Sequence, residues 1–423
     1  VDYIRDIAFQ YWVLRQAYPS WDIRCCLMMP DKATAAREDN LHQRFAVAFD
    51  EASPGSGDFR PRVDSVGDLE RERLDHCFLR RIPVDEQVER VLGSVLQIPG
   101  MTDDFASIAE QLADLRAQSR AIKPAPIGAH CKACEFYTPT PTPNARSGFH
   151  ECWAQQLGRD HGYRREDTVF GLYSPTGRGP RSTSRLVQDG YRWLSELDDD
   201  VLELPARPDG PLSTRDRQRM QVMGEWPGGG EYYFDSAGFT RALEACEWPL
   251  YFLDFEAARS ALPFRAGKRP NDIQIFQYSL HVMERDGRVR HEDEFLDLST
   301  QGDVNVRMLR RLKAALGSRG TVLRWTGYEN TVLNDVRRQL LASDTPPDDR
   351  DELVAFIETL THEKRGNTVI RRGSRDMVDQ AAWAEHFYFH PDTRGRYSIK
   401  PLLPAIMKSS AHLRDRYSRP IYG

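Results

Sequence analysis

Residues 248–256, Trp-Pro-Leu-Tyr-Phe-Leu-Asp-Phe-Glu, constrain the fold of this chain more than any other segment. Aromatic residues, Leu and Pro fill most of it, which predicts a strand buried on both faces. Side chains two residues apart on a strand point to the same side, so Asp254 and Glu256 are expected to lie together. Two such charges repel unless a cation or a shared proton relieves them. A hard ion, Mg²⁺ or Mn²⁺, meets that need; the alternative is an edge strand with a solvated acidic face.

The composition limits the class of protein. The chain has 423 residues, enough for two or three domains, and 29% charged with 40% hydrophobic residues indicates a soluble, cytoplasmic protein. No apolar run is as long as a membrane span, no signal peptide is visible, and a first residue Val1 is typical of a fragment. A net charge of −5 excludes a global attraction to nucleic acid, so such binding requires local basic patches. Seven cysteines, an odd number, favour thiols or metal ligands over disulfides.

Periodicity and turn residues predict a mixed α/β chain. Helices are expected over residues 6–17, 84–97, 102–120 and 304–316, with a small helical hairpin over 184–197. Strands are expected over residues 24–29, 273–282, 291–296 and 321–326, and a loop over 52–67, which is rich in Gly, Pro, Ser and Asp.

A cysteine cluster lies between residues 131 and 152. Cys131 and Cys134 have the spacing of a metal knuckle, Cys152 supplies a third thiol, and His130 and His150 flank them. Thiolates select Zn²⁺ or iron–sulfur clusters, so either a zinc site with one His or a cubane cluster fits this pattern. The alternative is three unrelated buried thiols. A cubane needs a fourth ligand, for which the candidates are Cys25, Cys26 and Cys77.

The order of several motifs along the chain resembles a known arrangement. Gln10 on a helix is similar to the end of a RecB/AddB-type, restriction-endonuclease-like nuclease core, and residues 127–136 with 151–153 are similar to its closing cysteine cluster. Residues 190–197 resemble the helical linker of the same proteins, and residues 251–256 resemble the first exonuclease motif of DnaQ-like, RNase H-fold nucleases. The chain thus resembles an uncharacterised bacterial family that fuses an iron–sulfur RecB-like nuclease module to a DnaQ-like (DEDD-type) domain.

The resemblance implies three regions: a C-terminal part of a RecB/AddB-like domain with the cluster (1–160), a helical-hairpin linker (161–245) and a DnaQ-like RNase H-fold domain (246–423). It implies a [4Fe-4S] cluster (alternatively Zn²⁺), Mg²⁺ or Mn²⁺, and cleavage of DNA or RNA by a two-metal mechanism, in defence or repair. Two departures stand against this. The Asp and Glu-x-Lys pair of the first nuclease centre does not precede Gln10, and the last exonuclease motif is not found. A catalytically inactive nucleic-acid-binding or assembly subunit of a larger complex is therefore the alternative.

Two-metal hydrolysis uses about four carboxylates around two ions. Residues 322–330 read as a strand, a small turn and an acid on the first helical turn, which resembles the second exonuclease motif with Glu329 in place of Asp. Asp379, after Met377 and Val378, resembles a later acidic position of DnaQ-like proteins. Helix-dipole stabilisation alone also accounts for Glu329.

A basic segment near residue 400 is the candidate contact with a phosphate backbone. It resembles the family's Ser-x-Lys segment, and its alternative is a solvated loop. The predicted nucleic-acid contacts are Gln10, Arg394, Arg396, Ser398 and Lys400, with further positive charge at Arg371, Arg372 and Arg375.

Overall fold

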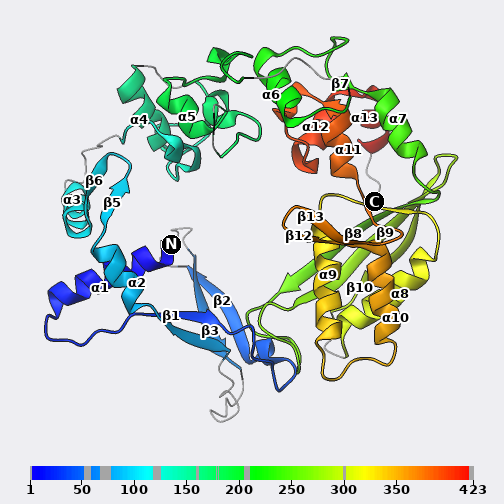
Figure 1. Ribbon diagram of the computed structural model, residues 1–423, viewed down its shortest axis with the longest axis horizontal. Helices are drawn as coiled ribbons and strands as arrows, with labels where there is room; N and C mark the ends of the chain where they lie inside the picture. The colour runs from blue at the N-terminus through cyan, green and yellow to red at the C-terminus, as the bar shows by residue number, and fades with distance from the viewer. Residues whose placement is uncertain are drawn as a thin grey trace. The chain divides into compact units, whose positions relative to one another are not determined.

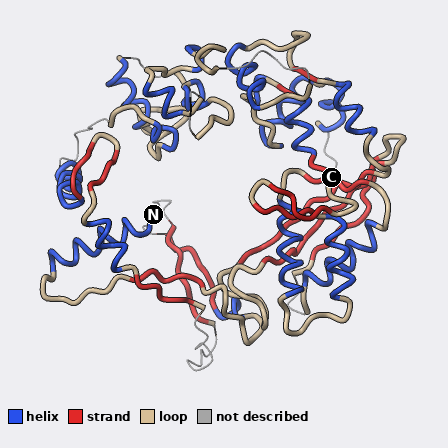
Figure 2. The backbone as a smooth tube through the Cα atoms, in the orientation of Figure 1, coloured by secondary structure: helices blue, strands red, loops and turns tan. Residues whose placement is uncertain are grey.

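The computed structural model describes residues 2–51, 59–66, 78–117, 125–158, 162–177, 179, 181–203, 210–298 and 302–418. Helices and strands alternate along them in a mixed α/β fold, which confirms the predicted class (Figures 1 and 2). The chain divides into two compact units. One comprises Val1–Cys25, Val84–Arg241 and Ala381–Gly423, and the other comprises Cys26–Pro83 and Ala242–Gln380.

A five-stranded sheet organises the unit that contains residues 242–380. Its strand order is β10-β9-β8-β11-β14; β9 runs antiparallel to both β8 and β10, whereas β11 and β14 run parallel to β8. The strands are β8 (Leu250–Arg259), β9 (Ile273–Met283), β10 (Val289–Leu296), β11 (Thr321–Arg324) and β14 (Val378–Asp379). The predicted strands over 273–282, 291–296 and 321–326 are confirmed, the last ending at Arg324.

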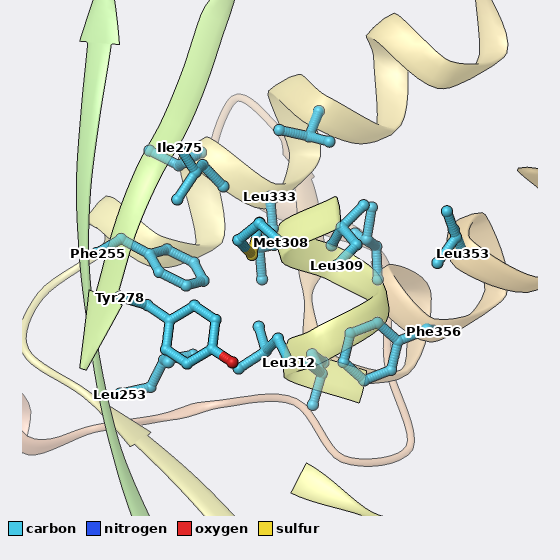
Figure 3. Packing of buried hydrophobic residues seen from close by; sticks show 14 of the residues in the cluster. Leu253, Phe255, Ile275, Tyr278, Met308, Leu309, Leu312, Leu333, Leu353 and Phe356 are labelled. Carbon is cyan, nitrogen blue, oxygen red and sulfur yellow. The ribbon is translucent and has the colours of Figure 1, made fainter. Parts of the chain in front are cut away.

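Two helices, α8 (Val304–Leu316) and α9 (Tyr328–Leu341), cover the apolar face of this sheet, and α10 (Arg350–Leu360) packs against both of them. The helix predicted at 304–316 forms with those bounds because its apolar residues recur at helical spacing. The Asp303 carboxylate caps its first turn. Figure 3 shows Met308 of α8 beside Phe255 of β8, and Leu309 on the side of α8 that faces Leu353 of α10.

The polar and apolar residues of β8 alternate between the two faces of the sheet. Leu253 and Phe255 are buried in the core, whereas Asp254 and Glu256 are exposed. The strand is confirmed, but the expectation that both of its faces are buried is wrong over residues 253–256. The helices pack on the face of Leu253 and Phe255.

The same unit contains three two-stranded sheets, β1 (Cys26–Pro30) with β4 (Leu79–Pro83), β2 (Phe45–Glu51) with β3 (Phe59–Ser65), and β12 (His362–Arg365) with β13 (Thr368–Arg372). The strand predicted at 24–29 is confirmed as β1. The loop predicted at 52–67 is wrong over β3, and residues 52–58 lie outside the described residues. In a two-stranded sheet each strand is an edge, so β3 tolerates Pro61 while Val63 pairs with Val47.

The other unit is mainly helical. Its elements are α1 (Asp2–Ala17), α2 (Asp85–Leu92), β5 (Val95–Ile98), β6 (Met101–Asp104), α3 (Phe105–Ala117), α4 (Gly148–Leu157), α5 (Thr183–Gln188), α6 (Thr214–Met223), β7 (Tyr233–Phe234), most of α7 (Ser236–Glu244), α11 (Gln380–Phe387), β15 (Tyr388–Phe389), α12 (Ile399–Ser409) and α13 (Ala411–Tyr417). Short 3₁₀ helices lie at Ala129–Ala133, Arg165–Asp167, Val169–Gly171, Leu194–Glu196 and Pro391–Thr393, and another, at Leu41–Arg44, belongs to the unit of the sheet.

Two of the predicted helices in this unit are shortened by a hairpin. Helix α2 ends at Leu92, and residues 95–104 form β5 and β6 around Gly100, whose φ of 82° suits a tight turn. The helix predicted at 102–120 therefore begins at Phe105. The helix predicted at 6–17 is confirmed as α1, and the hairpin predicted at 184–197 consists of α5 and a 3₁₀ turn.

Residues 381–418 group with the helical unit rather than with the sheet. Strand β15 pairs with β7, and the fully buried Arg217 of α6 donates to the carbonyl oxygens of Gly395, Glu385 and Tyr388 at 2.8, 2.7 and 2.7 Å. The spatial units thus differ from the predicted regions 1–160, 161–245 and 246–423. Within the described ranges, no helix is both long and apolar enough to cross a membrane.

Shortening a side chain at the centre of the sheet unit tests this packing. Leu309 is 0% exposed, so Leu309→Ala should lower the free energy of unfolding by about 2–5 kcal/mol. Leu298, which is 76% exposed, supplies the control. Leu298→Ala should change the free energy of unfolding by no more than about 0.5 kcal/mol. Urea titration followed by circular dichroism measures both; equal effects would contradict the core assignment.

Candidate active site and cysteine cluster

The two acidic side chains of β8 lie on the face of the sheet opposite the helices. Asp254 pairs with Ser279 of β9, and Glu256 pairs with Gln277. Directly paired residues share a face, so the two acids lie beside polar neighbours. The predicted arrangement of Asp254 and Glu256 on one side of a strand is confirmed.

A strained turn connects β11 to α9 and positions a third acid. Thr326 has φ of 68°, a conformation that β-branched residues rarely adopt. Its backbone N–H donates to Asp379 Oδ1 at 2.9 Å, which ties the turn to the end of β14. Helix α9 begins two residues later and presents Glu329 on its first turn, as the sequence predicted.

Glu329 is a buried acid with one unsatisfied oxygen. The residue is 3% exposed, and its Oε2 has no hydrogen-bond partner among the described residues. Burial, with smaller contributions from the charges of Asp254 and Asp379, raises the pKa of Glu329 from 4.5 to about 7. Tyr328, the preceding residue, is influenced by both Asp254 and Glu256, and its pKa is raised mainly by burial. The four predicted acids therefore belong to one electrostatic neighbourhood.

Asp379 is held by a cation that the sequence reasoning did not identify. Arg324, the last residue of β11, is 6% exposed, and its Nη1 donates to Asp379 Oδ2 at 3.2 Å. The two residues are partners in the parallel register of β11 and β14. An Arg at the end of the apolar run Val322-Leu323 was the available signal, because a charge on a central strand needs a partner.

This set of oxygen atoms suits a hard divalent cation. Carboxylates are the ligands that Mg²⁺ and Mn²⁺ prefer, and the unsatisfied Glu329 oxygen is a buried acceptor without a donor. Within the described ranges, no group of three or more His, Cys, Asp or Glu side chains is gathered closely enough to hold a metal ion. Metal binding would require the side chains of Asp254 and Glu256 to turn toward Glu329.

The three clustered cysteines belong to one hydrophobic cluster in the helical unit. Cys131 is buried, and Cys134 and Cys152 pack against the same cluster. Burial raises the pKa of the Cys152 thiol, and the nearby Cys131 and Cys134 raise it further. The structure thus places the three thiols in one hydrophobic cluster, although among the described residues no three such side chains are gathered closely enough to hold a metal ion.

The two neighbouring histidines differ in their availability. His130 Nε2 lies 3.6 Å from Cys131 Sγ. His150 is 1% exposed and uses both ring nitrogens, toward Ser147 Oγ at 2.7 Å and the Tyr163 carbonyl oxygen at 2.9 Å. His150 therefore has a packing role, and His130 is the histidine that lies against a cluster thiol.

The candidates for a fourth thiolate lie in different places. Cys25 is buried in the helical unit, with its backbone N–H bonded to Asp85 at 2.8 Å. Cys26 belongs to β1 of the other unit, and Cys77 lies outside the described residues.

The predicted nucleic-acid contacts lie in the helical unit. Arg394 pairs with Asp167 at 3.0 Å, and Gln10 donates to Asp6 within its own helix. Arg396 and Lys400 are exposed and have no ion-pair partner among the described residues. The remaining predicted contact, Ser398, is exposed at the N-cap of α12.

All three further arginines have partners in the structure. Arg371 donates to the Thr361 carbonyl and to Asn334, and Arg375 donates to the carbonyl oxygens of Gly317 and Gly320. The remaining one, Arg372, pairs with Asp376 at 3.0 Å. The positive charge expected from these residues is therefore largely neutralised or used to close loops.

Comparison with known proteins relates part of the chain to a family model. The model of a family described as a domain of unknown function (DUF2779) matches residues 251–398. This segment begins in β8 and contains the four acids together with Arg324. No curated protein and no solved structure matches the chain.

The pKa of Glu329 predicts how the stability of the metal-free protein depends on pH. Between pH 4.5 and about 7 the folded chain retains a proton that the unfolded chain has lost, so stability decreases as pH rises through this window. The loss amounts to about 3 kcal/mol. Glu329→Gln has no such proton and should lack this component of the pH dependence.

Unfolding in urea at several pH values measures this difference. As the pH rises from 5 to 8, the free energy of unfolding of Glu329→Gln should increase relative to that of the wild type. The exposed control Glu244→Gln should show the same pH dependence as the wild type. A constant difference between Glu329→Gln and wild type would contradict the assignment.

Proposed function

We propose that the sheet unit is the core of a metal-dependent nuclease that hydrolyses phosphodiester bonds of DNA or RNA. The strand order supports this reading. Three antiparallel strands are followed by two that are parallel to the first, in the chain order 3-2-1-4-5. This is the arrangement expected for the RNase H fold. The motif at residues 251–256 resembles the first exonuclease motif of nucleases that have this fold.

The observation that carries the proposal is the buried Glu329 of α9, which feels the charges of Asp254 on β8 and Asp379 on β14. Its pKa of about 7 reflects burial next to Asp254 and Asp379. A carboxyl group with a strongly raised pKa among other carboxylates is typical of catalytic and metal-binding sites. Structural carboxylates more commonly pair with Lys or Arg on the surface.

In this proposal Asp254, Glu256 and Glu329 hold Mg²⁺ or Mn²⁺. The bound ion would activate water and stabilise the leaving oxygen. Glu329 would release its proton when it becomes a ligand, since a metal ligand must be deprotonated. Asp379 keeps the β11–α9 turn in place through Thr326, and this turn positions Glu329.

The exposed Arg396 and Lys400 are the proposed contacts with the phosphate backbone, together with Ser398 at the start of α12. Backbone N–H groups at a helix N-terminus and basic side chains both bind phosphate oxygens. Arg394 is a weaker candidate because Asp167 neutralises it. Gln10 is proposed as a nucleic-acid contact only because it resembles a position at the end of the RecB/AddB-type nuclease core.

The cysteine cluster is proposed to be structural. Cys131, Cys134 and Cys152 would hold a [4Fe-4S] cluster, or Zn²⁺ as the alternative, in a module that resembles the end of a RecB/AddB-type nuclease. Metal binding there would contribute free energy to the folding of the surrounding helices.

A second function is a catalytically inactive nucleic-acid-binding or assembly subunit in a defence or repair complex. The ion pair between Asp379 and Arg324 favours it, because a carboxylate with a guanidinium partner is a poorer metal ligand.

Asp254→Asn separates the two functions. The amide has the same volume and relieves repulsion with Glu256, so the metal-free melting temperature should hold or rise. Mn²⁺-dependent cleavage of labelled oligonucleotides should be lost, together with any rise in melting temperature caused by Mn²⁺. The control Glu244→Gln should retain both. A wild-type protein that neither cleaves nor gains stability from Mn²⁺, yet binds oligonucleotides in a salt-sensitive way, would establish the inactive subunit instead.

Metal analysis tests the cysteine cluster. Protein purified without oxygen should be brown, contain iron and sulfide in similar amounts, and lose its colour in Cys131→Ala. That variant should also unfold more easily, whereas Cys246→Ala, outside the cluster, should keep the colour. Stoichiometric zinc in a colourless, stable protein would replace the iron–sulfur assignment with a zinc knuckle.

A further inference from the structure

A buried guanidinium lies within the group of proposed metal ligands. Arg324 is 6% exposed at the end of β11, bonded to Asp379, and close enough to Glu329 to lower its pKa against the effect of burial. Arginine stays charged in proteins, so its burial requires carboxylate or carbonyl acceptors. Among the described residues Asp379 is its ion-pair partner, and Glu329 lies close enough for the two charges to interact.

Both oxygens of Asp379 are already used. Oδ1 accepts the Thr326 N–H at 2.9 Å, and Oδ2 accepts Arg324 Nη1 at 3.2 Å. A dication on this carboxylate would lie beside the guanidinium, where the repulsion between like charges is weakly screened by solvent. Asp379 is therefore placed to hold the turn, not to bind an ion.

The other acids have different surroundings. Asp254 and Glu256 are exposed on β8 and form no ion pair among the described residues, and Glu329 Oε2 is buried without a donor. Once the side chains of Asp254 and Glu256 turn toward Glu329, these three carboxylates would suffice for one hard ion, whose remaining positions water or substrate oxygens would fill. They are too few for a pair of ions that shares about four carboxylates.

We propose that this site binds one divalent cation, and that Arg324 supplies the fixed positive charge that a second ion would otherwise provide. Arg324 is then a positioning residue: it holds Asp379, which holds Thr326, which orients Glu329. The inference rests on the proposed function and departs from the two-ion arrangement that the family resemblance implies.

The number of Mn²⁺ ions bound per chain tests the inference without an activity measurement. Calorimetric titration of the metal-free protein with Mn²⁺ should give one ion per chain, and Asp254→Asn should lose it. Arg324→Met should bind two, because Asp379 is released as a ligand and the repulsion is removed. Arg324→Lys, which keeps the charge, should still bind one.

Arg338→Met is the matched control, since Arg338 lies in α9 with its side chain 61% exposed; it should bind one ion. Two ions on the wild type, both sensitive to Asp254→Asn, would overturn the inference while the nuclease proposal stands. One ion on a folded Arg324→Met would also overturn it. No Mn²⁺ binding by the wild type would instead remove the proposed function itself. If Arg324→Met does not fold, the inference is tested by the number of Mn²⁺ ions bound to the wild type and to Arg324→Lys, which should be one for each.

Discussion

The packing of Leu253 and Phe255 against the helices determines where the acids of this site lie. Side chains on a strand alternate between faces, so burial of these two residues places Asp254 and Glu256 on the opposite face. A shift of the strand by one residue would expose both apolar side chains and bury both charges. The free energy of the hydrophobic core thus maintains the backbone positions of the acids, whereas their side chains still have to turn toward one another to bind an ion.

The parts of this unit that could be predicted from the sequence are those in which burial dominates local preference. Helix α8 and strand β9 have long apolar patterns with one period, and both were predicted nearly to the residue. Strands β3 and β5 were missed because their short segments carry turn-forming residues or follow a helix directly. Their pairing depends on a partner strand, which a local pattern does not contain.

In the candidate site, too, contacts between segments that are distant in the sequence could not be predicted from local patterns. The acids could be named because strand, turn and helix place them in recognisable positions, but their partners could not. Arg324 meets Asp379 through strand pairing across 55 residues of sequence. In the helical unit, Arg217 likewise meets backbone carbonyls 168 to 178 residues away. Backbone acceptors leave no mark on composition, so the grouping of residues 381–418 with α6 was not visible in the sequence.

The two buried arginines also show how charge is balanced differently in the two units. Arg217 is hydrogen-bonded to backbone carbonyl oxygens and surrounded by the rings of Tyr173, Phe389 and Tyr397, which makes it part of the core. Arg324 instead faces carboxylates, one of which, Glu329, changes its charge near neutral pH. Without metal, a proton on Glu329 and the charge of Arg324 together offset the crowded acids. A cation that displaces this proton adds one net charge to the site rather than two, and the guanidinium sets the limit on how many such cations the acids accept.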